Sequence, residues 1–213
     1  MSKKRVVLFD FDGVIMDTEG VYTEFWNKRG EKYLGIQEFG ELVKGSTDTV
    51  IYDKYFSNHQ ALISKINEEV IALEENMTFE YIAGAHSFLY ELKNKGLQIG
   101  MATSSDQRKM KLVYQQHPDL KQLLDCVITS DEVNQPKPSP ESYLKAMKIL
   151  GVGPEETVIF EDSLFGLQAA RSAGAVVVGV STSHTEQEIA KFCDHIIPDF
   201  SAMTYERLLE FYK

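Results

Sequence analysis

Two carboxylates, Asp10 and Asp12, follow a run of four apolar residues from Val6 to Phe9, and Gly13 comes next. Such a run is typical of a buried strand. Two like charges at the end of a buried strand repel each other and are costly to desolvate, so the arrangement is unfavourable for stability alone. A bound cation would remove this cost. We therefore predict a metal site where the first strand ends, at which Asp10 could attack a phosphate.

Polar residues also follow later apolar runs. Because 32 of the 213 residues are acidic, pairs spaced like Asp10 and Asp12 arise several times by chance. The polar residues after the later strands are therefore needed to support a functional site. Thr103, Ser104 and Ser105 come directly after a predicted strand over residues 97–102. Hydroxyls and free N–H groups before a helix suit phosphate oxygens, although an ordinary helix N-cap would use the same residues.

Lys137 lies between Pro136 and Pro138, after a predicted strand over residues 126–129. The two prolines restrict the backbone, so this lysine is better placed than most to carry a fixed positive charge, although any single lysine more often faces solvent. Glu161 and Asp162 end a further predicted strand, where a surface helix cap is the alternative interpretation. Carboxylate oxygens of this kind suit Mg²⁺, whereas no histidine or cysteine is spaced for zinc.

The overall composition fits one sizeable globular domain, or a domain with an insertion. The net charge of −10 disfavours nucleic acid as a partner, since phosphate backbones call for a basic surface. The apolar run near the N-terminus is too short for a signal peptide or a membrane span, so we expect no membrane association. Two cysteines in unrelated contexts, Cys126 and Cys193, fit a reducing cytoplasm. We expect a monomer.

The order of predicted elements indicates an α/β fold with a doubly wound parallel sheet. Residues 18–79 show helical periodicity and few β-type runs, whereas strands and helices alternate from residue 84 onward. We therefore predict a Rossmann-like core of residues 1–16 and 81–213, and a small α-helical module of residues 17–80 inserted after the first strand. Ligands bind at the carboxyl ends of the strands in such sheets, so the insertion should cover the site.

Four motifs in this order resemble the haloacid dehalogenase-like hydrolase superfamily, and within it the β-phosphoglucomutase-like and phosphoglycolate-phosphatase-like proteins. The resemblance covers essentially the whole chain, and the inserted helices look like the cap domain of that family. It rests on Asp10-Phe-Asp12-Gly13-Val, on Thr103, on Lys137 within Lys-Pro-Ser-Pro-Glu, and on Glu161-Asp162-Ser163 followed by Gly166.

The resemblance implies a role for each residue of the motifs. Asp10 would attack phosphorus to form an aspartyl-phosphate, and Asp12 would be the general acid and base. Mg²⁺ would be held by the carboxylate of Asp10, the backbone carbonyl of Asp12 and Asp162, with Glu161 close by. The residues that would bind the phosphoryl group are Gly13 through a free N–H, Thr103, Ser104 and Lys137.

The resemblance therefore implies a Mg²⁺-dependent phosphatase of a small phosphorylated metabolite, such as a sugar phosphate. A sugar-phosphate mutase is the alternative. Mutase-like members carry a cap histidine where this chain has Tyr22, and an arginine near the position of Asp48, which would repel a second phosphate. Both differences favour the phosphatase. A catalytically idle binding module is a third hypothesis, against which the complete set of motifs argues.

Overall fold

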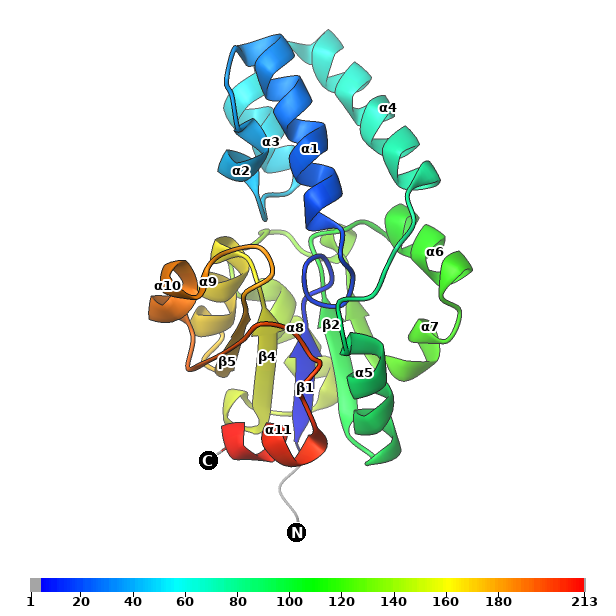
Figure 1. The fold of residues 1–213 in the computed structure, drawn as a ribbon, viewed down its shortest axis with the longest axis vertical. Helices are drawn as coiled ribbons and strands as arrows, with labels where there is room; N and C mark the ends of the chain where they lie inside the picture. Colours follow the sequence, from blue (N-terminus) through cyan, green and yellow to red (C-terminus); the bar gives the residue numbers. More distant parts are fainter. Residues whose placement is uncertain (1–4, 213) are drawn as a thin grey trace.

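The computed structural model describes residues 5–212, and its centre is a parallel sheet of six strands in the order β3-β2-β1-β4-β5-β6 (Figure 1). The predicted doubly wound α/β fold is thus confirmed. The strands are β1 (Val6–Phe9), β2 (Gln98–Ala102), β3 (Cys126–Ile128), β4 (Thr157–Glu161), β5 (Val176–Val180) and β6 (His195–Ile197).

Both faces of the sheet are buried, which explains why its strands are apolar runs rather than alternating patterns. Val7 and Phe9 of β1 point into one hydrophobic cluster, and Val6 and Leu8 point into a second on the opposite face. The first cluster is covered by α5 (Ala85–Asn94), α6 (Gln107–Gln116), α7 (Leu120–Leu123) and α11 (Tyr205–Phe211). The second is covered by α8 (Glu141–Leu150), α9 (Leu164–Ser172) and α10 (Glu186–Ile189).

The helices between β1 and α5 lie over the carboxyl ends of the strands (Figure 1). They have a hydrophobic cluster of their own, which includes Phe25, Trp26, Phe39 and Ile66. We call residues 17–80 the cap, with the boundaries that the sequence predicts. Its helices are α1 (Glu19–Arg29), α2 (Phe39–Val43), α3 (Asp48–Ile51) and α4 (Gln60–Asn76), with π-helical turns at Gly30–Leu34 and Tyr52–Phe56.

The differences from the predicted elements concern short segments. The predicted helix over residues 186–192 is α10 followed by a 3₁₀ turn at Ala190–Phe192. The sequence did not indicate α7 or the 3₁₀ turns Ser130–Glu132 and Pro154–Glu156, because three or four residues carry too little periodicity. None of the helices within residues 5–212 has the length and apolar content that crossing a lipid bilayer requires.

Candidate active site

The acidic residues at the carboxyl ends of β1 and β4 meet because these two strands are neighbours in the sheet. The backbone N–H of Asp10 donates to the carbonyl of Phe160 at 2.9 Å, which continues the strand pairing by one residue. The winding of the sheet reverses between β1 and β4, and ligands bind at such a reversal. Carboxylate oxygens of Asp10, Glu161 and Asp162 all lie within 4.8 Å of one another.

Lys137 is buried between two of these carboxylates. Its Nζ lies 2.8 Å from Oδ1 of Asp10 and 2.7 Å from Oε1 of Glu161. Burial lowers the pKa of Lys137, but the charges of Asp10 and Glu161 raise it well above its usual value, so the side chain remains an ammonium group. The hydroxyl of Tyr143 also donates to Oε1 of Glu161, and the N–H of Ser163 donates to Oε2. Both oxygens of Glu161 are therefore engaged, and one of them fixes Lys137.

The carboxylates fit a divalent cation. Asp162 is buried, and its Oδ1 has no hydrogen-bond partner within the described chain, while its Oδ2 accepts from the hydroxyl of Ser183. Burial raises the pKa of Asp10 to about 8 although Lys137 opposes the change, and burial together with Glu161 raises the pKa of Asp162 well above its usual value. Three buried carboxylates thus lie together, only two of them contact the buried lysine, and their oxygens are of the type that Mg²⁺ prefers.

Gly13 does not have the free N–H that the sequence predicted. Its N–H donates to the carbonyl of Met16 at 2.8 Å, and its carbonyl accepts from the hydroxyl of Thr182 at 2.5 Å. Glycine is required for two other reasons. Its φ of +73° is unfavourable for other residues, and a β-carbon at this position would lie 2.0 Å from Oδ2 of Asp162.

The predicted hydroxyl residues lie in the loop between β2 and α6. Thr103 is buried at the end of β2, and its hydroxyl accepts from the N–H of Ser105 at 3.0 Å. Ser104 lines the pocket described below. The loop ends at Asp106, whose side chain accepts from the N–H of Lys109 at 2.7 Å and so caps α6.

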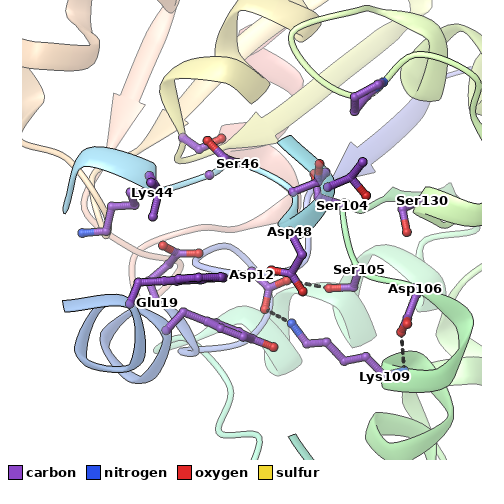
Figure 2. Close-up of a pocket in the computed structure, with 18 of the residues that line it drawn as sticks. Asp12, Glu19, Lys44, Ser46, Asp48, Ser104, Ser105, Asp106, Lys109 and Ser130 are labelled. Carbon is purple, nitrogen blue, oxygen red and sulfur yellow. Dashed lines mark hydrogen bonds and ion pairs between the residues drawn. The ribbon is translucent and has the colours of Figure 1, made fainter. Parts of the chain in front are cut away.

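Asp12 is held by the side chains of Lys109, Thr18 and Ser105, two of which are labelled in Figure 2. Its Oδ1 lies 2.6 Å from Nζ of Lys109 and accepts from the hydroxyl of Thr18, while its Oδ2 accepts from the hydroxyl of Ser105 at 2.7 Å. Burial raises the pKa of Asp12, but the charge of Lys109 and these hydrogen bonds outweigh burial and lower it overall. The sequence did not single out Lys109.

A pocket of about 500 Å³ lies between the core and the cap, and Asp10, Asp12, Ser104 and Asp162 all line it. The cap side contributes Tyr22, Asp48 and Glu74, among others. The hydroxyl of Tyr22 donates to Oε1 of Glu74 at 2.7 Å, and Arg108 of α6 donates to Oε2 of the same glutamate. Buried Glu74 therefore joins a cap residue to a core helix at the edge of the pocket.

Several residues that hold the site together belong to none of the four sequence motifs, so the sequence did not indicate them. Thr18, Tyr143 and Ser183 are common hydrogen-bonding types whose contacts depend on the tertiary structure. Lys109 gives one signal in the sequence. It precedes Met110 and lies four residues before Val113, and all three are buried, so it interrupts an apolar helix face with a charge.

Residues 7–180 match the haloacid dehalogenase-like hydrolase family. The chain belongs to this family. It is 33% identical over 184 residues to the phosphorylated carbohydrates phosphatase of Thermotoga maritima, which covers 80% of this chain and 82% of that protein. The predicted resemblance is confirmed, and so is the prediction of a phosphohydrolase.

Two solved structures show the same fold. A family hydrolase from Entamoeba histolytica superimposes with a TM-score of 0.82 at 24% identity, covering 98% of this chain and 99% of that one. The β-phosphoglucomutase of Clostridium difficile gives a TM-score of 0.80, also at 24% identity, and covers 98% and 97% of the two chains. A hydrolase and a mutase thus share this architecture, so the activity has to be argued from the residues of the site.

Proposed function

We propose that this chain is a Mg²⁺-dependent phosphatase that hydrolyses a small phosphorylated carbohydrate through an aspartyl-phosphate on Asp10. One observation carries the proposal. Nζ of Lys137 lies 2.8 Å from Oδ1 of Asp10, and Asp162 of the same cluster has an Oδ1 without a hydrogen-bond partner among residues 5–212. A carboxylate between a fixed ammonium group and a cation site can be approached by a phosphate dianion, which free carboxylates would repel.

The two aspartates divide the chemistry. In the first half, an oxygen of Asp10 bonds to phosphorus while the bond from phosphorus to the ester oxygen breaks. Asp12 enters this step carrying a proton, although Lys109 lowers its pKa, and gives that proton to the departing oxygen. In the second half, Asp12 takes a proton from water as the water oxygen bonds to phosphorus, and the bond to Asp10 breaks. Inorganic phosphate leaves and both aspartates return to their starting states.

Asp10, Asp162 and the backbone carbonyl of Asp12 would hold Mg²⁺, which would offset the charge between Asp10 and the phosphoryl oxygens. We assign Glu161 mainly to positioning, because its oxygens already accept from Lys137, Tyr143 and Ser163. Lys137, Thr103 and Ser104 would bind the phosphoryl group. For Gly13 we propose the steric role described above in place of a phosphate contact.

The charges of the pocket favour one phosphate over two. Within residues 5–212, the three cations that line the pocket are already paired with acids: Lys44 with Glu41, Arg108 with Glu74 and Lys109 with Asp12. Two carboxylates, Asp48 and Glu74, line the cap side of the pocket. Tyr22 lines it too, and its hydroxyl donates to Glu74. A second phosphate would meet carboxylates there. A monophosphate whose other groups are neutral hydroxyls suits this wall better, because hydroxyls can donate to carboxylates.

A phosphate-release screen tests the activity, with Mg²⁺ present and with sugar phosphates, glycerol phosphate, phosphoglycolate, nucleotides and pyrophosphate as substrates. We expect turnover of sugar or polyol monophosphates. The mutase alternative is tested with β-glucose 1-phosphate and catalytic glucose 1,6-bisphosphate, following glucose 6-phosphate and free phosphate together. Rapid formation of glucose 6-phosphate with little free phosphate would establish a mutase instead.

We propose that the enzyme works in the cytoplasm as a monomer and without nucleic acid as a partner. Free Cys126 and Cys193 are compatible with a reducing compartment, and the net charge of −10 is unfavourable for nucleic acid. Light scattering at micromolar concentration tests the monomer: a mass close to 24.2 kDa is expected.

A further inference from the structure

Lys109 is a buried lysine outside the four sequence motifs. It is only 3% exposed, and its Nζ lies 2.6 Å from Oδ1 of Asp12. The same Nζ lies 4.5 Å from the centre of the Tyr22 ring and 5.4 Å from the centre of the Phe11 ring. Burying an ammonium group costs free energy unless it is paired, and Asp12 is the carboxylate that compensates it.

The surroundings of Lys109 limit where its side chain can point. Asp106 accepts its backbone N–H and fixes the start of α6, so that the side chain extends toward Asp12 (Figure 2). Tyr22 covers the ammonium group and is itself held by Glu74, which also accepts from Arg108. Among the described residues, Asp12 is therefore the side chain to which the ammonium group of Lys109 donates.

The two aspartates of the site thus have one lysine each. Lys137 contacts Asp10, and Lys109 contacts Asp12. Thr18 and Ser105 also donate to Asp12, so its carboxylate receives donors from three directions. Thr18 stands just before the first cap helix, while Ser105 and Lys109 belong to the loop and helix that follow β2.

We propose that Lys109 is a positioning residue that holds the carboxylate of Asp12 where it can exchange a proton with the leaving oxygen and with water. The proposal rests on the proposed function, in which Asp12 is the general acid and base. Without the ammonium group, the two hydroxyls can still bond to Asp12 but no longer fix its direction, and proton transfer requires hydrogen-bond distance. Phosphate binding does not depend on this contact, and attack by Asp10 depends on it only where the departing oxygen needs a proton.

The test uses Lys109→Met, which removes the charge but keeps an apolar side chain of similar length. With an alkyl phosphate such as glycerol phosphate, the departing oxygen needs a proton, so we expect phosphorylation of Asp10 to slow by roughly 100-fold or more. With p-nitrophenyl phosphate, the departing phenolate is stable without one. We therefore expect the pre-steady-state burst of p-nitrophenol to stay within about threefold of the wild type, followed by slow turnover, because hydrolysis still needs Asp12 as a base.

Two further variants serve as references. Lys109→Arg keeps the charge and should restore part of the rate with the alkyl phosphate. Lys111→Met removes an exposed lysine from the same helix and should leave both substrates unaffected. Circular dichroism melts establish that each variant is folded, and crystal structures of the wild type and of Lys109→Met should show the Asp12 carboxylate displaced only in the variant.

Three outcomes would overturn the proposal. An equal loss of the burst with both substrates, in a folded variant, would make Lys109 a general structural residue. A rise in KM with unchanged kcat would make it a substrate ligand. If the wild type releases phosphate from no ester, the proposed function itself fails. This last outcome is distinguishable from the other two because it is seen with the wild-type enzyme alone. The first two outcomes can be observed only when the wild type is active.

Discussion

Gly13 and Asp162 are packed so closely that a β-carbon on Gly13 would lie 2.0 Å from Oδ2 of Asp162. The two residues come from the loop after β1 and from the end of β4, so the glycine sets how near these segments approach. Asp162 is also the residue whose Oδ1 lacks a partner in the described chain. The absence of a side chain at Gly13 therefore determines the position that the carboxylate of Asp162, a candidate metal ligand, can occupy.

Gly13→Ala should consequently impair activity far more than it impairs folding. Displacing Asp162 by an ångström or so should cost about 100-fold in kcat/KM, by the scale of such misplacements. Gly35→Ala is the matched control. Gly35 has a similar φ of +68°, but a β-carbon there meets nothing within 4 Å. Both variants share the backbone penalty of about 1–2 kcal/mol. Comparable activity in the two variants would show that the contact with Asp162 does not matter.

Asp10→Asn should abolish turnover while leaving the fold intact, because the amide has the same shape but is not a nucleophile. We expect kcat to fall by much more than tenfold, which corresponds to a loss of more than 1.4 kcal/mol of transition-state stabilisation. Asp17→Asn, an exposed residue of the same segment, should keep full activity. A variant at position 10 that retains a tenth of the wild-type kcat would exclude Asp10 as the nucleophile.

Activity should require Mg²⁺ and should vanish with excess chelator, because Asp10 and Asp162 offer only oxygen ligands. Ca²⁺ should inhibit, since it favours larger and less regular coordination. Asp162→Asn should weaken Mg²⁺ binding in calorimetric titration, whereas Asp53→Asn, on an exposed part of the cap, should not change it. Full activity in EDTA would refute the metal assignment.

The parallel sheet and the main catalytic motifs could be predicted because their signals are local. A run such as Val6 to Phe9 identifies a buried strand by itself, and the carboxyl ends of parallel strands face the same edge. Asp10, Lys137 and Asp162 each stand just after a strand or in the loop that follows it, so the topology alone brings them together. Short elements such as α7 were missed because four residues do not establish a period.

The contacts of Asp12 could not be predicted in the same way. Lys109 meets Asp12 across 97 residues of sequence, and its place on an apolar helix face does not indicate which carboxylate it contacts. The N–H of Gly13 was expected to be free, but the chain turns back at once and Met16 accepts it. Both cases depend on how a loop folds over a neighbouring element, which neither composition nor spacing records.

Asp48 should make the free energy of unfolding of the enzyme depend on pH. Burial, followed by the nearby charge of Glu74, raises the pKa of Asp48 from 3.8 to about 6, although Lys109 and Arg108 oppose the change. The folded state therefore holds the proton more firmly than the unfolded state. As pH rises from about 4 to 6 the folded protein must lose this proton, and the free energy of unfolding should decrease accordingly.

Asp48→Asn cannot lose a proton and should remove this dependence. Urea unfolding of the wild type and the variant should show a difference that grows in favour of the variant between pH 4 and pH 7 and then stays constant. Two pKa units correspond to at most about 3 kcal/mol, and less where water reaches the carboxylate. Asp53→Asn, exposed on the same cap, should give a difference that does not change over this range. The contrary result is a difference in unfolding free energy between wild type and Asp48→Asn that does not change with pH. It would mean that Asp48 ionises in the folded enzyme as easily as in the unfolded chain.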